Sequence, residues 1–165
     1  MSAILSKTEK ETEQLAKKLA KCCPKNARLI IFLNGDLGAG KTFFVRALIK
    51  NLGYRGLVKS PTYNIIETYE LVDYFINHLD LYRLQTANEI FELGLCDEFE
   101  QPALWLIEWA ERASAFLPKP DIVCHINLIN RHRQIVFQAN TFLGEQTLTL
   151  FNLDLGKSIF LLKGH

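Results

Sequence analysis

The chain has 165 residues, of which 48% are hydrophobic and 22% charged, and its formal net charge at pH 7 is +1. This length suits one domain with a substantial core, and no Gly/Ser/Pro-rich stretch could serve as a linker, so we expect a single domain over residues 1–165. The near-neutral charge argues against an extended surface for nucleic acid. No run approaches the ~20 apolar residues that cross a bilayer, and no apolar segment follows Met1, which predicts a cytoplasmic protein without a membrane partner.

The four cysteines argue against a zinc-binding or disulfide-stapled protein. They lie at positions 22, 23, 96 and 124. Their spacing fits neither a zinc site nor a disulfide framework. We therefore expect reduced, mostly buried thiols.

The first predicted element is an amphipathic helix. Ser6 and Glu9 have the spacing of a capping box, and the segment up to about Lys21 places Leu15 and Leu19 at helical intervals. This pattern predicts a helix that packs on a sheet.

A predicted strand from Arg28 to about Leu33 leads directly into a glycine-rich loop. The loop matches the phosphate-binding pattern G-x-x-x-x-G-K-[ST] at every fixed position. Its residues are Gly35, Asp36, Leu37, Gly38, Ala39, Gly40, Lys41 and Thr42. Glycines let backbone N–H groups turn inward around an anion, the lysine places a charge on the outer phosphates, and the threonine offers a hydroxyl to Mg²⁺. The loop therefore predicts that the chain binds a nucleoside triphosphate.

The other predicted elements follow from turn signals and from the period of the apolar residues. They are a helix that ends at Gly53, a hairpin of residues 63–71 and 72–79, a short helix from Thr86 to Gly94, a buried strand from Ala103 to Trp109, a second hairpin of residues 122–128 and 135–139, and a further strand around residues 147–151. Together they predict an α/β sandwich like that of P-loop NTPases, with a mixed, mainly parallel central sheet, antiparallel hairpins and helices on both faces.

Two carboxylates follow predicted strands, at the sheet edge where ligands of such folds bind. Glu108 ends the apolar run of residues 104–107, and Asp80 ends the run of residues 74–79. Either could hold the metal while the other orients water or polarises a nucleophile, although both could also be solvated carboxylates at strand ends. His78 fits a structural and a functional role almost equally well.

The loop Ser60-Pro61-Thr62-Tyr63 lies just after the helix that follows the phosphate loop. In nucleotide hydrolases a loop at this place can supply a hydroxyl that senses the γ-phosphate. An ordinary turn explains the same residues equally well.

The order and spacing of the motifs resemble the TsaE family, the bacterial YjeE-type ATPases. The resemblance rests on the phosphate loop, Ser60-Pro61-Thr62-Tyr63, the segment His78-Leu79-Asp80-Leu81-Tyr82-Arg83-Leu84 and the pair Glu108-Trp109, and it covers about residues 5 to 140. It implies an ATP-hydrolysing accessory subunit of the machinery that makes threonylcarbamoyladenosine in tRNA. The implied partners are TsaD and TsaB, with TsaC supplying the activated threonylcarbamoyl group and tRNA involved only indirectly.

The resemblance also implies roles for individual residues. Thr42 and Glu108 look like Mg²⁺ ligands, Asp80 like the carboxylate that works with the attacking water, and Thr62 like the switch residue near the γ-phosphate. Arg133 is similar to a basic residue near the nucleotide base. One departure stands beside the phosphate loop, where this chain has Phe43 and the family usually has a second threonine, and the segment after about residue 150 is longer than is usual in the family.

A small-molecule P-loop kinase is the main alternative on the sequence alone. Such an enzyme normally needs a mobile lid whose arginines exclude water, and only Arg131 and Arg133 are close enough together to suggest one. A guanine-specific switch protein is disfavoured because the sequence contains no [NT]-K-x-D motif. A purely structural nucleotide-binding module would require that the carboxylates lie elsewhere.

Overall fold

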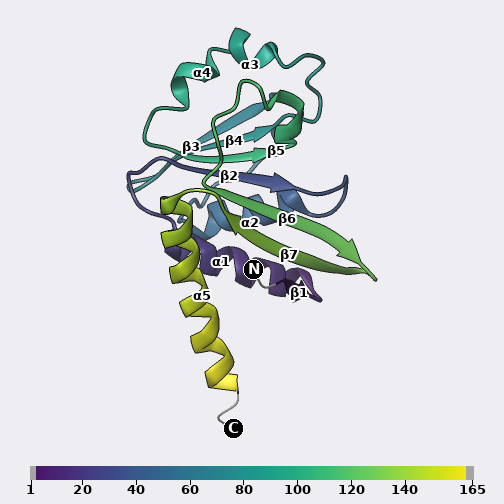
Figure 1. The fold of residues 1–165 in the computed structure, drawn as a ribbon, viewed down its shortest axis with the longest axis vertical. Helices are drawn as coiled ribbons and strands as arrows, with labels where there is room; N and C mark the ends of the chain where they lie inside the picture. Colours follow the sequence, from purple (N-terminus) through teal and green to yellow (C-terminus); the bar gives the residue numbers. More distant parts are fainter. Residues whose placement is uncertain (1–2, 163–165) are drawn as a thin grey trace.

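The computed structural model describes residues 3–162 (Figure 1). In chain order the elements are β1 (Ile4–Ser6), α1 (Glu9–Cys22), β2 (Leu29–Asn34), α2 (Lys41–Asn51), β3 (Ile66–Glu70), β4 (Phe75–Asp80), α3 (Glu89–Glu92), α4 (Leu95–Glu98), β5 (Leu104–Glu108), the 3-10 helix η1 (Ala110–Ala113), β6 (Ile122–Ile129), β7 (His132–Ala139) and α5 (Phe142–Leu162).

The described strands form one seven-stranded sheet in the order β1-β7-β6-β2-β5-β4-β3. β2 runs parallel to β5 and β6, and β4 runs parallel to β5, whereas β1, β3 and β7 pair antiparallel. The apolar strands β2 and β5 lie side by side in the centre, as continuous apolar runs favour. The predicted mixed sheet, parallel in its centre and flanked by hairpins, is confirmed.

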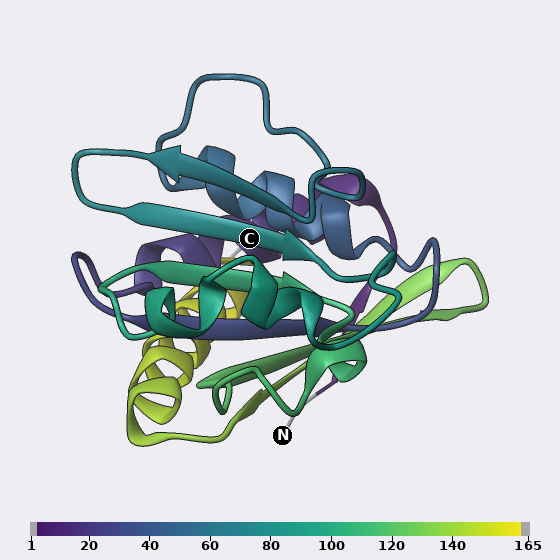
Figure 2. The same cartoon turned by 90° about the horizontal axis from the view of Figure 1, so that it is seen from above.

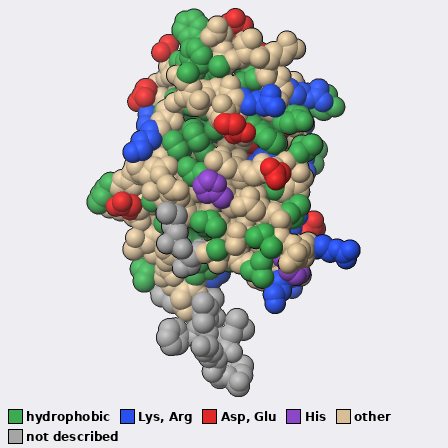
Figure 3. Space-filling view, turned by 45° about the vertical axis from the view of Figure 1, so that its right-hand side comes forward, with side chains coloured by type: hydrophobic (Ala, Val, Ile, Leu, Met, Phe, Trp, Pro, Cys, Tyr) green, Lys and Arg blue, Asp and Glu red, His purple; other side chains and the backbone are tan. Residues whose placement is uncertain are grey.

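Helices cover both faces of this sheet (Figures 1 and 2). One core cluster joins the sheet to α1, α2 and α5 through buried residues such as Leu19, Phe44 and Phe151. The second cluster lies on the opposite face and joins the sheet to α3, α4 and η1 through residues such as Ile90 and Trp105. On the face drawn in Figure 3, acidic and basic side chains are scattered among apolar and neutral ones, in keeping with the near-neutral charge.

The first helix begins at a different cap from the one predicted. The N-cap is Thr8, whose Oγ1 accepts from the N–H of Glu11, and the Glu11 carboxylate accepts from the N–H of Lys7. The predicted cap, Ser6, instead ends β1, a strand that the sequence did not indicate, and its hydroxyl lies 2.7 Å from that of Thr12. The capping-box spacing was therefore present, but shifted by two residues.

Both predicted hairpins are confirmed, as is the short helix before Gly94. The Glu89 carboxylate accepts from the N–H groups of Gln85 and Thr86, and Gly94 has a φ of 71° after the helix ends. In the second hairpin the turn residues Asn130 and Arg131 both have positive φ, the geometry of a tight two-residue turn.

The strand expected around residues 147–151 is wrong, because these residues lie within α5. The alternation of threonine and leucine there resembles a strand, but Leu143, Thr147 and Phe151 recur every four residues on the helix face that meets the sheet. Thr141 precedes the helix and caps it, because its Oγ1 accepts from the N–H of Gly144.

The cysteines are free thiols; Cys23 and Cys124 are buried, and Cys22 and Cys96 are half-buried. Within residues 3–162, no helix combines the length and apolar character that crossing a membrane requires.

Candidate nucleotide-binding and hydrolytic site

The phosphate loop connects the end of β2 to the start of α2, with glycines in conformations that other residues rarely adopt. Gly35, Gly38 and Gly40 have φ values of 150°, 80° and 105°. A Cβ atom on Gly35 would lie 2.1 Å from the backbone oxygen of Ile126, so a side chain does not fit there. The loop therefore needs glycine for both its path and its packing.

Lys41 is the first residue of α2 and is only 5% exposed. Its Nζ donates to the carbonyl oxygens of Gly35 and Asp36, at 2.6 and 3.0 Å, and lies 3.9 Å from the ring centroid of Trp109. Burial lowers the pKa of Lys41, while the Glu108 and Asp80 carboxylates act in the opposite direction. The cation is thus held at the loop, facing the carboxylates.

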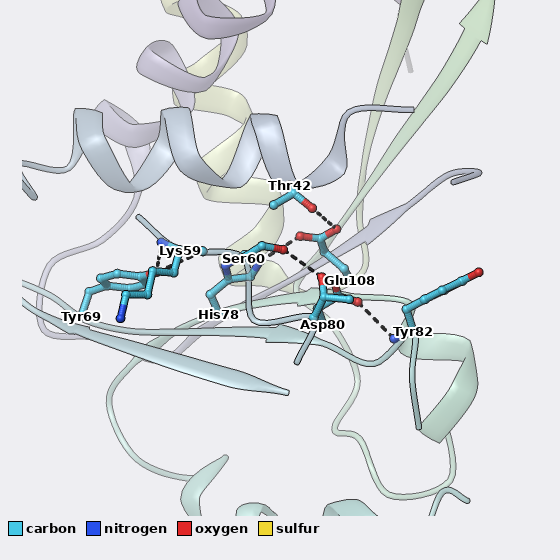
Figure 4. A network of polar contacts seen from close by, with 9 residues as sticks. Thr42, Lys59, Ser60, Tyr69, His78, Asp80, Tyr82 and Glu108 are labelled. Atoms are coloured by element: carbon cyan, nitrogen blue, oxygen red, sulfur yellow. Dashed lines mark hydrogen bonds and ion pairs between the residues drawn. The ribbon is translucent and has the colours of Figure 1, made fainter. Parts of the chain in front are cut away.

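Glu108, at the end of β5, links the phosphate loop to β4 (Figure 4). Its Oε2 accepts from the Thr42 hydroxyl at 2.9 Å, and its Oε1 lies 2.8 Å from Nε2 of His78. The carboxylate is 2% exposed and the imidazole fully buried. Each oxygen of this buried carboxylate therefore has one partner from the protein.

Asp80, at the end of β4, has a separate set of donors. Its Oδ2 accepts from the Thr62 hydroxyl at 2.7 Å and its Oδ1 from the N–H of Tyr82 at 3.1 Å. The Ser60 hydroxyl lies 2.8 Å from that of Thr62. The loop of residues 60–63 is thus joined to the carboxylate at the strand end, which a turn of purely local role would not require.

These groups line one cavity of 290 Å³. Its walls are Leu37, Gly38, Gly40, Lys41, Thr42, Phe43, Thr62, Asp80, Tyr82, Arg83, Glu108 and Trp109. Larger hollows of 790 and 630 Å³ lie beside α5 and beside the β3–β4 turn, but neither is lined by the phosphate loop or by the carboxylates Asp80 and Glu108. The smaller cavity brings the loop, both carboxylates and the Thr62 hydroxyl together.

The oxygen groups of this cavity suit Mg²⁺. A threonine hydroxyl that donates its hydrogen to Glu108 keeps its lone pairs for a cation. Among the described residues, no three His, Cys, Asp or Glu side chains are grouped to hold a metal ion. Mg²⁺ is usually bound through one or two protein groups, with its other ligands from phosphates and water.

Arg133, at the start of β7, packs against the phosphate loop. Its Nε donates to the carbonyl oxygen of Ala39 at 3.2 Å, and its guanidinium lies 5.5 Å from the Phe43 ring. A Cβ atom on Gly40 would lie 2.6 Å from the same Nε. Arg133 thus supports the loop backbone, and its role near a nucleotide base stays a prediction.

The sequence left two neighbours of the site undecided or unnoticed. It did not decide the role of His78, and it did not place Arg83 on the cavity wall. Trp109, next to Glu108, does border the site, and its ring lies over Lys41. The segment around Asp80 contains Arg83, so its spacing offered a signal. The pairing of His78 with Glu108 depends on the register of β4 and β5, which no local pattern contains.

Comparison with known proteins agrees with this arrangement. Residues 6–135 match the family "Threonylcarbamoyl adenosine biosynthesis protein TsaE". The chain is 40% identical over 124 residues to the tRNA threonylcarbamoyladenosine biosynthesis protein TsaE of Haemophilus influenzae, covering 75% of this chain and 78% of the relative. It is 39% identical over 142 residues to the Rickettsia bellii protein of the same name, covering 86% and 96%.

A solved structure gives the same result for the fold. The crystal structure of Bacillus subtilis YdiB superposes with a TM-score of 0.78 and 27% identity, covering 93% of this chain and 95% of the other. The phosphate loop, the carboxylates at the strand ends and these matches lead to one conclusion: the chain belongs to the TsaE family.

Proposed function

We propose that this protein hydrolyses ATP with Mg²⁺ and that hydrolysis acts on a TsaB–TsaD complex during threonylcarbamoyl modification of tRNA. One observation carries the hydrolytic part. The phosphate loop and the two carboxylates, Asp80 and Glu108, line the same cavity, although they come from three separate segments of the chain. The names of the relatives support the pathway.

Each group in the cavity has a distinct task in this reaction. The loop N–H groups and Lys41 would bind the outer phosphates, and Thr42 and Glu108 would hold Mg²⁺, which when bound would neutralise charge that develops on the phosphate oxygens. Asp80 orients the attacking water and accepts its proton, because the donors from Thr62 and Tyr82 fix the carboxylate and leave lone pairs free.

The loop of residues 60–63 supports the proposal that partners stimulate hydrolysis. Tyr63 is 80% exposed beside the Thr62 hydroxyl that bonds Asp80, so a protein docked there could change the position of the water-orienting group. We expect slow turnover by the isolated chain and faster turnover with the partners. The chain itself should contact tRNA only indirectly, through the complex.

The kinase alternative has weaker support. In a kinase lid Arg133 would have to move freely, but its side chain donates to the backbone of the phosphate loop. Arg131 lies in a two-residue turn. The two arginines thus stand in a hairpin rather than in a long mobile segment.

The test is phosphate release from ATP by the purified chain, with and without TsaB and TsaD homologues from the same organism. We expect low turnover that rises with both partners and that Glu108→Gln abolishes. Glu70→Gln serves as the control, because Glu70 is exposed at the far end of β3. Stoichiometric phosphorylation of a metabolite with ADP release would establish the kinase instead.

A further inference from the structure

His78 is a fully buried polar residue that the proposed reaction does not use. It lies in the middle of β4, pairs in register with Leu106, and meets Glu108 through Nε2 at 2.8 Å. Its Nδ1 is buried without a hydrogen-bond partner in the described part of the chain. The imidazole therefore makes one polar contact, and that contact is to the carboxylate of the site.

The contact with Glu108 sets the direction of this hydrogen bond. Glu108 accepts at Oε1, so Nε2 carries the hydrogen. His78 therefore donates one hydrogen bond, from Nε2 to the Glu108 carboxylate.

We infer that His78 is a positioning residue that holds Glu108 in the orientation needed to bind Mg²⁺; this inference rests on the proposed function. The hydrogen bond from Nε2 ties down Oε1, which leaves Oε2 directed at the Thr42 hydroxyl. Both proposed metal ligands are thus aligned before the cation arrives. Residues that orient metal ligands in this way typically change metal affinity by about 10–100-fold when they are replaced.

Two substitutions separate the hydrogen bond from the packing. In His78→Gln the amide nitrogen is as many bonds from Cα as Nε2 of histidine, so a donor can still reach Glu108. His78→Met has similar length and no donor. His78→Asn keeps an amide, but the side chain is too short to reach Glu108. This variant tests the role of the hydrogen bond if the methionine variant does not fold.

The measurement is binding of the non-hydrolysable analogue AMP-PNP to the full chain by calorimetry, at a series of Mg²⁺ concentrations and in EDTA. We expect His78→Met and His78→Asn to raise the Mg²⁺ concentration for half-saturation by about 10–100-fold. His78→Gln should restore the wild-type value, and binding in EDTA should be the same for all four proteins.

Equal Mg²⁺ dependence in all four proteins would overturn the inference and leave the proposed function intact. A loss in EDTA as large as the loss with Mg²⁺ would also overturn it, because His78 would then act on the fold of the pocket. If wild-type binding did not depend on Mg²⁺, the proposed function and the inference would both fail.

Discussion

Asp80 and Glu108 stand opposite each other in the parallel pairing of β4 with β5, each as the last residue of its strand. They nevertheless have separate partners, since Asp80 bonds Thr62 and Glu108 bonds Thr42 and His78. One carboxylate is therefore joined to the loop of residues 60–63 and the other to the phosphate loop. Substitutions at the two positions should have different consequences.

Asp80→Asn should lower the rate of ATP hydrolysis while sparing nucleotide affinity. A group that takes the proton from the attacking water contributes typically about 10²–10⁴-fold, and the amide cannot take that proton. Single-turnover hydrolysis gives the rate and calorimetry gives the affinity. Asp97→Asn is the control, because Asp97 is an exposed residue of α4. An equal loss of affinity and rate would show that Asp80 serves binding instead.

The hydroxyl of Thr62 should matter for turnover more than its methyl group. Thr62→Val removes the donor to Asp80 and should slow hydrolysis by about 10–100-fold, the range expected for a hydrogen bond to a charged group. Thr62→Ser keeps the donor and should retain most of the rate. If both variants slow hydrolysis equally, the bond between Thr62 and Asp80 does not control the reaction.

The parts of the fold that could be predicted are those whose signal is local. Continuous apolar runs gave β2 and β5, glycine spacing gave the phosphate loop, and alternation gave both hairpins. The missed strand β1 has three residues and exists through its pairing with β7, far along the chain. Threonine and leucine alternate in part of α5, which is also the pattern of a strand, and the sequence alone does not show which face of this segment is buried.

The residues of the candidate site could be predicted from local patterns, but the contacts between them could not. Lys41 and Thr42 were placed by a motif, and Asp80 and Glu108 by the ends of strands. The contact between His78 and Glu108 comes from the register of two strands that are distant in sequence. Register depends on the packing of the whole sheet, so the sequence pattern could name these residues without showing which of them bond.

Asp121, just before β6, should be important for stability and not for nucleotide binding. It is 7% exposed, its Oδ2 accepts from the N–H of Ile30 at 2.8 Å, and its Oδ1 accepts from the Thr141 hydroxyl at 2.5 Å. Asp121→Ala should lower the free energy of unfolding by about 3 kcal/mol, because it leaves a buried N–H without an acceptor. Urea unfolding measures this loss.

Asp121→Asn should lose less stability, since one acceptor oxygen remains. AMP-PNP affinity should stay at the wild-type value in both variants. Asp121 precedes β6 at one end of the parallel strands, and the phosphate loop follows β2 at their other end. A stability loss below about 1 kcal/mol in the alanine variant would mean that these bonds contribute little.

Thiol labelling should follow burial. Burial raises the pKa of Cys23 to about 12 and also raises the pKa of Cys124, so neither forms the reactive thiolate near neutral pH. Burial, with the nearby Asp154 carboxylate, also raises the pKa of Cys22.

Iodoacetamide should therefore modify Cys96 first, then Cys22, and the other two only after unfolding, as peptide mass mapping would show. The same reaction in denaturant is the control, since all four thiols should then react alike. Rapid labelling of Cys124 in the native protein would contradict the buried position of this residue in β6.

Two glycines of α5 should respond in opposite directions to the same substitution. Alanine in a helix interior is more favourable than glycine by about 0.5–1 kcal/mol. At Gly156 the added Cβ would meet no described atom within 4 Å beyond the helix's own backbone, so Gly156→Ala should stabilise the protein by about that amount. At Gly144 the added Cβ would lie 2.1 Å from the backbone oxygen of Asp121, and the helix would have to move. We expect Gly144→Ala to destabilise by about 1–3 kcal/mol in urea unfolding. Equal effects at the two positions would mean that α5 does not pack closely on the segment before β6.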